Sequence, residues 1–259
     1  MRFATSRWFA GIILCCLCGA ASATPSAQQL LEASDAIRNP SKPFSLTTTL
    51  IEFHQGRQTD QNLLTVYSKI DPDGGQYRSL VHFDAPARDV DKLLLKNGLD
   101  MWFYDPSSQA SVRISPQQRL LGQAANGDVV TVNWAHDYAP SLAGEEDITD
   151  GERQLKHCYK LTLLARSPEA TYHSIELWLD SATKRPVKAR FYAESGTLLK
   201  ASYFRRFQEE LGTVRPTEIV IIDGLDPGSV TVMRYSNYEW RDIADSWMQH
   251  DYLAHFKPN

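Results

Sequence analysis

Apolar and polar residues alternate with a period of two along most of this chain. After Pro43, short runs rich in β-branched and aromatic residues are separated by D-P-D-G-G, D-A-P, N-G and D-P-S-S, which are turn-forming sequences. A period of two places one side of a strand in the core and the other in solvent. The pattern predicts an antiparallel meander with strands at 44–53, 62–70, 76–83, 92–96, 101–104, 111–114, 158–165, 173–180, 186–192, 198–204, 217–223 and 229–235.

The residues before this meander follow a helical period. Ser26 can cap a helix with Gln29 three residues later, the next apolar residues recur every three or four positions, and Asn39-Pro40 ends the pattern. We therefore expect one amphipathic N-terminal helix. Since strands and helices do not alternate elsewhere, the pattern favours a barrel or a strongly curved sheet over a doubly wound fold, in a single domain over residues 24–259.

Residues 113–147 interrupt the meander. Pro116 can begin a helical turn, residues 122–128 are rich in helix breakers, and the acidic run 144–151 is interpreted as a solvated turn that contains Glu145, Glu146 and Asp147. A long irregular segment inside a compact β domain is usually functional. We predict that this insert forms a lid.

The N-terminal residues have the features of a signal peptide. Arg2 and Arg7 precede an apolar run that is shorter than the roughly 20 residues of a membrane-spanning helix, and Ala21-Ser22-Ala23 is a cleavage pattern. We expect cleavage after Ala23 and export. Cys158 is then the one cysteine of the mature chain, and we interpret it as a buried strand residue. The net charge of −4 argues against nucleic-acid binding.

Catalytic and metal-binding patterns are weak. The chain has no G-x-S-x-G, H-E-x-x-H, G-x-G-x-x-G or P-loop motif. His136-Asp137 could form half of a catalytic triad, but no recognisable nucleophile accompanies it, and we interpret it as an ordinary hydrogen-bonded pair. His250, Asp251 and His255 have the spacing of a surface segment rather than of a metal site. We expect that the protein is not an enzyme and that it binds no metal or cofactor.

An apolar inner face that side chains do not fill would instead enclose a cavity for a small ligand or an acyl chain. The alternative is an interior that Leu, Val and Trp side chains fill completely. Trp102 and Tyr104 are candidates for the cavity or its rim. The other candidates for the inner face share the alternating pattern of the later strands: Leu161, Leu163, Ile175, Leu177, Val187, Ala189 and Phe191.

The middle third of the chain carries a set of motifs. These are an F-x-x-P strand end, a hydrophobic strand, a W-x-Y-x-P strand, an R-I-S segment and an insert with Gly and Asp, at Phe83 and Pro86, Leu93 to Leu95, Trp102, Tyr104 and Pro106, Arg113 to Ser115, Gly122, Asn126 to Asp128, and Asp137-Tyr138. The combination resembles the exported outer membrane lipoprotein-sorting protein family, which is related to the LolA and LolB carriers. The resemblance covers most of the mature chain in layout.

The resemblance implies a mainly β fold, an incompletely closed antiparallel β-barrel with helices and loops across its open side. It also implies a carrier that takes a lipid or the acyl chains of a lipoprotein through the periplasm, with transient membrane contact. The insert would be the lid, with Arg113 or Arg119 holding it closed and Gly122, Gly127 and Asp128 within it.

The resemblance further makes an inner-membrane lipid-exporting permease a plausible partner. A periplasmic adaptor of such a permease, without a lipid of its own, is the alternative function. A hydrolase with a nucleophile beside His136 is the third.

Overall fold

The computed structural model describes residues 25–258, so the predicted signal peptide lies outside the described residues. Every predicted strand is present. The structure consists of α1 (Ala27–Arg38), β1 (Phe44–His54), β2 (Arg57–Ile70), β3 (Tyr77–Ala85), β4 (Leu93–Asn97), β5 (Asp100–Asp105), β6 (Ala110–Arg113), β7 (Arg119–Leu121), β8 (Ala124–Ala125), η1 (Asn126–Asp128), α2 (Trp134–Asp137), β9 (Tyr138–Thr149), β10 (Leu155–Ala165), β11 (Ser174–Asp180), β12 (Pro186–Tyr192), β13 (Leu198–Glu210), β14 (Thr213–Asp223), β15 (Ser229–Trp240), η2 (Asp245–Met248) and η3 (His250–His255).

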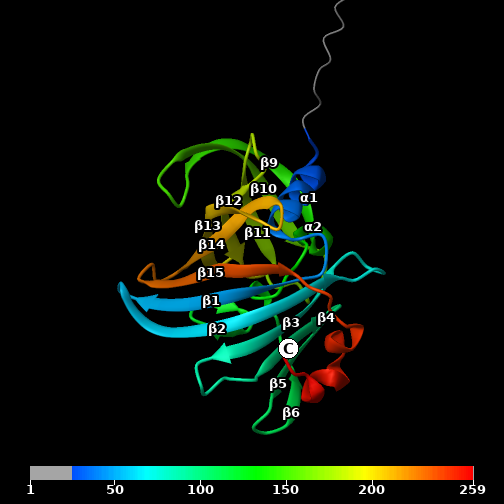
Figure 1. Ribbon diagram of the computed structural model, residues 1–259. Helices are drawn as coiled ribbons and strands as arrows, with labels where there is room; N and C mark the ends of the chain where they lie inside the picture. The colour runs from blue at the N-terminus through cyan, green and yellow to red at the C-terminus, as the bar shows by residue number, and fades with distance from the viewer. Residues whose placement is uncertain (1–24, 259) are drawn as a thin grey trace, which may run out of the picture.

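Thirteen strands form one antiparallel sheet in the order β6-β5-β4-β3-β2-β1-β15-β14-β13-β12-β11-β10-β9. The first and last strands of the chain pair with each other, from Phe44 opposite Trp240 to His54 opposite Ser229, and so join the two halves of the meander. The sheet curves strongly around its inner face (Figure 1). Its edge strands β6 and β9 do not pair with each other. This incompletely closed barrel confirms the predicted fold class.

The main core fills the concave side of the sheet. Inward-facing residues alternate with outward-facing ones, as Phe44, Leu46 and Leu50 do in β1, and Leu30 and Leu31 of α1 pack into the same core. The Ser26 hydroxyl accepts from the Gln29 amide, the Gln29 side chain accepts from the Ser26 amide, and the helix ends before Asn39. The predicted helix and its capping box are thereby confirmed.

A second apolar cluster lies on the outer face of the other half. Leu80, Leu93 and Leu95 of β3 and β4 point away from the main core and pack against Met248 and Leu253 of the C-terminal 3-10 helices, which Figure 1 shows beside β4 to β6. Within residues 25–258 no helix is long and apolar enough to cross a membrane.

The predicted irregular insert is shorter than expected. Residues 114–137, hereafter the insert, contain the small β7–β8 hairpin, η1 and α2, whereas Tyr138–Thr149 is the edge strand β9. The interpretation of residues 144–151 as a solvated turn was therefore wrong for most of that run. Glu145, Glu146 and Asp147 pair in register with Tyr159, Cys158 and His157 of β10. Because an edge strand is solvated on one side, it carries the acidic composition of a loop.

Candidate functional site

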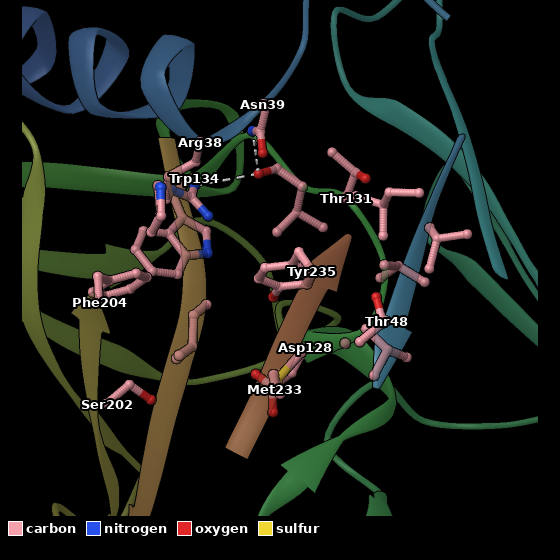
Figure 2. Close-up of a pocket in the computed structure, with 18 of the residues that line it drawn as sticks. Arg38, Asn39, Thr48, Asp128, Thr131, Trp134, Ser202, Phe204, Met233 and Tyr235 are labelled. Atoms are coloured by element: carbon pink, nitrogen blue, oxygen red, sulfur yellow. Dashed lines mark hydrogen bonds between the residues drawn. The ribbon is translucent and has the colours of Figure 1, made fainter. Parts of the chain in front are cut away.

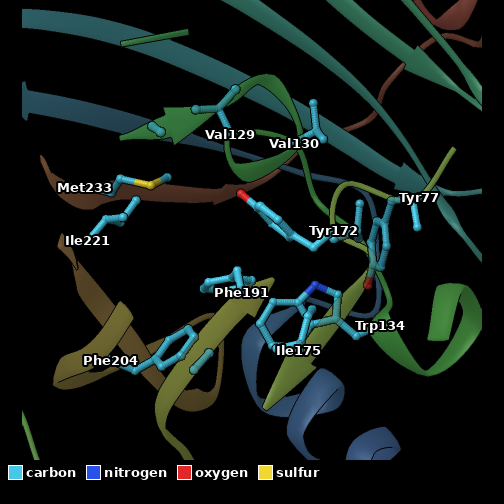
Figure 3. Close-up of a cluster of buried hydrophobic side chains, with 14 of the residues drawn as sticks. Tyr77, Val129, Val130, Trp134, Tyr172, Ile175, Phe191, Phe204, Ile221 and Met233 are labelled. Carbon is cyan, nitrogen blue, oxygen red and sulfur yellow. The ribbon is translucent and has the colours of Figure 1, made fainter. Parts of the chain in front are cut away.

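A cavity of about 120 Å³ lies between the concave side of the sheet and the insert. One water needs about 10–15 Å³ of such space, so this cavity has room for on the order of ten water molecules. Its wall comes from β1, β12, β13, β14 and β15, and residues 127–132 of the insert cover it (Figures 2 and 3). The apolar part of the lining includes Phe44, Leu46, Phe191, Phe204, Ile221 and Met233.

The insert spans the opening between the two halves of the sheet. On one side the Thr131 amide donates to Ser79 Oγ at 3.2 Å, and the Thr131 hydroxyl lies 2.8 Å from Ser68 Oγ. On the other side the Gln117 side chain donates to the Ala170 carbonyl at 2.6 Å. The insert is thus attached at both ends of its path, largely through side-chain hydrogen bonds rather than through the ladder of the large sheet.

Two glycines let the insert approach the barrel closely. A Cβ atom at Gly127 would lie 2.1 Å from Thr171 Oγ1, and one at Gly122 would lie 2.3 Å from Thr231 Oγ1. Gly122 also has a φ of +52°, in the left-handed region that favours glycine. Both glycines lie in the insert, and the close approach explains sterically why glycine stands at each position. Their part in a lid stays a prediction.

A buried ion pair fastens the middle of the insert to the barrel wall. The Lys200 side chain lies on the inner face of β13, contacts the Asp128 carboxylate and donates to the Gln123 carbonyl at 2.8 Å. Asp128 Oδ1 also accepts from the Tyr172 hydroxyl at 2.7 Å, and Asp128 Oδ2 accepts from the Ala125 amide at 2.7 Å. Lys200 is 4% exposed, and this burial lowers the pKa of its ammonium while Asp128 opposes the shift.

A second polar contact joins the end of α1 to the insert. The Asn39 side chain donates to the Val132 carbonyl at 2.8 Å, and the Arg38 guanidinium lies over the Trp134 ring, 3.8 Å from its centroid. Asp35 pairs with Arg38 and accepts from the Ala135 amide at 2.7 Å. Burial raises the pKa of the Asp35 carboxyl, against the lowering effect of Arg38. The helix therefore positions the side of the insert that carries Trp134.

The comparisons with known proteins agree with this architecture. A LolA superfamily protein from Nitrosomonas europaea is 35% identical to this chain, with a TM-score of 0.79, and the match covers 88% of this chain and 100% of that one. This chain belongs to the LolA superfamily. A family model described as "uncharacterized protein" matches residues 75–255, and the search of curated proteins finds no match.

Two further solved structures share the LolA-like fold. A DUF1329 family protein from Desulfovibrio piger is 24% identical with a TM-score of 0.74, over 88% of this chain and 97% of that one. An outer membrane lipoprotein-sorting protein domain from Vibrio parahaemolyticus is 18% identical with a TM-score of 0.73, over 88% of this chain and 98% of that one. At these identities the likeness concerns the fold alone.

Most of the residues predicted for the inner face of this LolA-like barrel do lie there. Leu161, Leu163, Ile175, Leu177 and Phe191 are buried in the main core. Phe191 also lines the cavity, whereas the other four lie behind its wall. Their contact with a ligand stays a prediction.

Three predicted cavity residues lie elsewhere. Trp102 and Tyr104 of β5 belong to the outer cluster beneath the C-terminal helices, and the Trp102 ring lies 4.1 Å from the His250 ring. Val187 packs on the outer face with Cys158 and Trp178, because a register shift between Trp178 and Leu179 leaves it as an extra residue of β12. The prediction that these three line the cavity was wrong.

The arginines proposed to hold the LolA-like lid are both exposed at the surface. Arg113 pairs with Asp100 of β5 at 2.5 Å, and Arg119 reaches Asp223 of β14 at 3.4 Å. The contact of Arg119 joins the insert to the barrel. Arg113 lies in the edge strand β6 and makes no such connection through its contact with Asp100. Sequence reasoning missed Lys200, because a lysine between apolar residues of a strand carries no motif that distinguishes it from a solvated one.

Two of the histidines considered for chemistry lie close to polar side chains. His136 Nδ1 lies 3.2 Å from Asp137 Oδ1, and the other partner of that oxygen is the Gln76 side chain at 2.9 Å. His250 lies 2.9 Å from Ser111 Oγ and beside Trp102. Cys158 is fully buried, and burial raises the pKa of its thiol to about 12, as expected for an inert strand residue.

Proposed function

We propose that this LolA superfamily protein is an exported, periplasmic carrier that holds a lipid, or an acyl chain of a lipoprotein, in the cavity beneath the insert during transfer between membranes. The observation that carries the proposal is a largely apolar cavity covered by the insert. Side-chain contacts hold the insert in place, rather than pairing with the main sheet. Burial of about a dozen methylenes supplies on the order of 10 kcal/mol before ordering costs, which is the scale needed to retain a lipid outside a membrane.

The volume of the cavity bears on how the cargo enters. Ten water molecules occupy about 300 Å³ as liquid, which is the small end of ligand pockets. A long chain, or more than one chain, therefore requires the insert to move outward. The contacts of Lys200, Asn39 and Thr131 with the insert are those that such a movement breaks.

The proposal is tested by native mass spectrometry of the full chain expressed with its own N-terminal segment and purified from the periplasm without detergent. A stoichiometric adduct that extraction identifies as an acylated molecule supports the carrier. A bare mass, with no uptake from offered vesicles, contradicts it and favours the adaptor of a membrane permease.

A further inference from the structure

The outer face of the sheet carries an apolar patch where β1, β15 and β14 lie side by side (Figure 1). Two neighbouring rows of the ladder cross these strands, with Ile51, Val232 and Val220 in one row and Phe53, Val230 and Ile222 in the next. Along the same strands they alternate with Ile221 and Met233, which line the cavity, so they point to the opposite side of the sheet. We call these six residues the outer patch.

The outer patch is not covered by another part of the described chain. Ile51 is buried among its neighbours and the other five residues are half-buried, but none of the six belongs to, or packs against, the apolar clusters of residues 25–258. Leu199 of β13 extends the same face and is 41% exposed. The outer face of β3 and β4, by contrast, is covered by the C-terminal 3-10 helices. A contiguous uncovered apolar surface usually marks contact with another molecule or a membrane.

The next row of the same ladder is positively charged. It contains Arg234 of β15, Glu218 of β14 and Arg205 of β13. The buried Glu218 carboxylate lies 2.8 Å from Arg234 Nε, 2.7 Å from Arg205 Nε and 3.4 Å from Arg206 Nε. Because three guanidinium groups share one carboxylate, a net charge of +2 borders this side of the outer patch.

Strand β12 adds further cations on a second side. Lys188 is opposite Tyr203, the residue that continues the row of Val220, and its ammonium forms no ion pair with a described residue. Arg190 and Lys160 share the Glu176 carboxylate, at 3.7 Å and 2.8 Å. Positive charge in excess of the carboxylates therefore follows two sides of the outer patch.

We propose that this face docks on the surface of an anionic phospholipid bilayer, with the outer patch toward the lipid and the surrounding cations toward the headgroup phosphates. Apolar side chains beside arginines and lysines match the boundary between acyl chains and anionic headgroups. A second copy of the chain would bring the same positive charge against itself. The convex curvature of the face, which Figure 1 shows, offers no cleft for a peptide, and a bilayer needs none.

This inference goes beyond the carrier function, because docking and cargo binding use opposite faces of the sheet. Cosedimentation with vesicles tests it, using the full chain purified from the periplasm. We expect binding to phosphatidylcholine vesicles with about one-third phosphatidylglycerol to be at least about tenfold tighter than to phosphatidylcholine alone with the same acyl chains. Raising the ionic strength from about 0.05 M to about 0.5 M should weaken it severalfold. Equal binding to both vesicles would overturn the proposal.

The double variant Arg190→Gln/Arg206→Gln tests the charged border. Both side chains are exposed, and Arg205, Arg234 and Lys160 remain to neutralise the two carboxylates. Affinity for the anionic vesicles should fall at least about fivefold. Arg88→Gln/Arg113→Gln is the matched control, since it removes the same charge from side chains that are 62% and 61% exposed, on the loop after β3 and on β6. An equal loss in both double variants would show that only net charge matters, and would contradict the assigned face.

Leu199→Gln tests the apolar contact. It should weaken binding to the anionic vesicles about threefold or more, because the polar side chain no longer gains from leaving water. Leu142→Gln is the matched control, since Leu142 is also 41% exposed but lies in the edge strand β9. If Leu142→Gln loses binding and Leu199→Gln does not, the edge strand faces the bilayer and the proposal is wrong.

The outcomes are separate from those of the carrier function. A protein that binds anionic vesicles through this face but is purified without cargo and takes up none supports the docking face and contradicts the carrier. A protein that retains a lipid but does not bind the vesicles does the reverse.

Discussion

The ammonium of Lys200 contacts the carboxylate of Asp128 inside the protein, joining strand β13 to the one-turn helix η1 of the insert. Asp128 lines the cavity, and Tyr172 donates to the same carboxylate. Buried ion pairs contribute little net stability, but removing one partner leaves an uncompensated charge. The pair therefore makes the observed position of the insert specific, and under the proposed carrier function its separation would be a step of opening.

Lys200→Met should loosen the insert. We expect a loss of about 3–5 kcal/mol in the free energy of unfolding, because Asp128 is left buried without its cation, and a faster release of bound lipid. Urea unfolding and the off-rate of a fluorescent fatty acid measure the two effects. Arg119→Met is the control, since its exposed contact with Asp223 is expected to contribute less than about 1 kcal/mol. An unchanged off-rate in a folded Lys200→Met protein would contradict this role.

Gly127→Ala should displace the insert sterically. The added methyl group would lie 2.1 Å from Thr171 Oγ1 and 2.7 Å from Thr171 Cγ2, so we expect destabilisation by about 1–3 kcal/mol. Thr171→Ala should restore part of this loss, because it removes both of these atoms. Gly74→Ala, where nothing lies within 4 Å of the new atom, is the control. Thermal unfolding of the single and double variants measures these effects. A Tm of Gly127→Ala equal to that of Gly74→Ala would refute the close approach.

Filling the cavity should separate lipid binding from stability. Leu46 lines the cavity, and Leu46→Phe adds volume to the unfilled space without placing a polar group in the core. We expect at least a tenfold loss of lipid affinity with a change in unfolding free energy within about 1.5 kcal/mol. Leu225→Phe, at a position that is 82% exposed, controls for added surface. Undiminished lipid uptake by folded Leu46→Phe would place the binding site elsewhere.

A buried histidine should make stability depend on pH. His82 Nδ1 lies 2.7 Å from Asp84 and Nε2 lies 2.9 Å from Asp91, and these carboxylates raise the pKa of the imidazole despite its burial. The stabilisation is therefore fully present below the unfolded pKa of about 6.5 and is lost as the pH rises through the higher folded value.

His82→Gln should flatten this dependence. The loss of stability should be about 1–2 kcal/mol at pH 6 and smaller at pH 8. Urea titrations at both pH values measure the difference between the variant and the wild type. His157 also has a raised pKa, so it too makes the protein less stable as the pH rises. The stability of the variant must therefore be compared with that of the wild type at each pH. A loss that is equal at both pH values would show that His82 is held neutral.

Twelve of the thirteen strands of the large sheet were predictable because each has its own alternating pattern and its own turn, whereas the acidic edge strand β9 was not. The helix at 27–38 was predictable for the same local reason, a capping box followed by an apolar stripe. Which residues of a strand point toward the main core was not always predictable. Trp102 and Tyr104 alternate like core residues but are covered by the C-terminal helices, and a bulge sends Val187 to the outer face.

The residues that close the cavity depend on contacts between distant parts of the chain. Lys200 and Asp128 are 72 positions apart, and Arg38 meets Val132 across 94 positions. Neither pair has a local signature, because burial rather than neighbouring sequence distinguishes these charged groups from solvated ones. Thr48 likewise stands in a run of three threonines, and only the alternation of side chains along the strand decides which of them faces the cavity.

The central claim is that the cavity carries a lipid between membranes, and a transfer assay tests it most directly. Donor vesicles with a quenched fluorescent fatty acid are mixed with unlabelled acceptor vesicles, and the protein is added at rising concentration. The account predicts a transfer rate that rises in proportion to the wild-type protein and falls at least tenfold with Leu46→Phe. A rate that is independent of the protein, or equal for the wild type and Leu46→Phe, would contradict it.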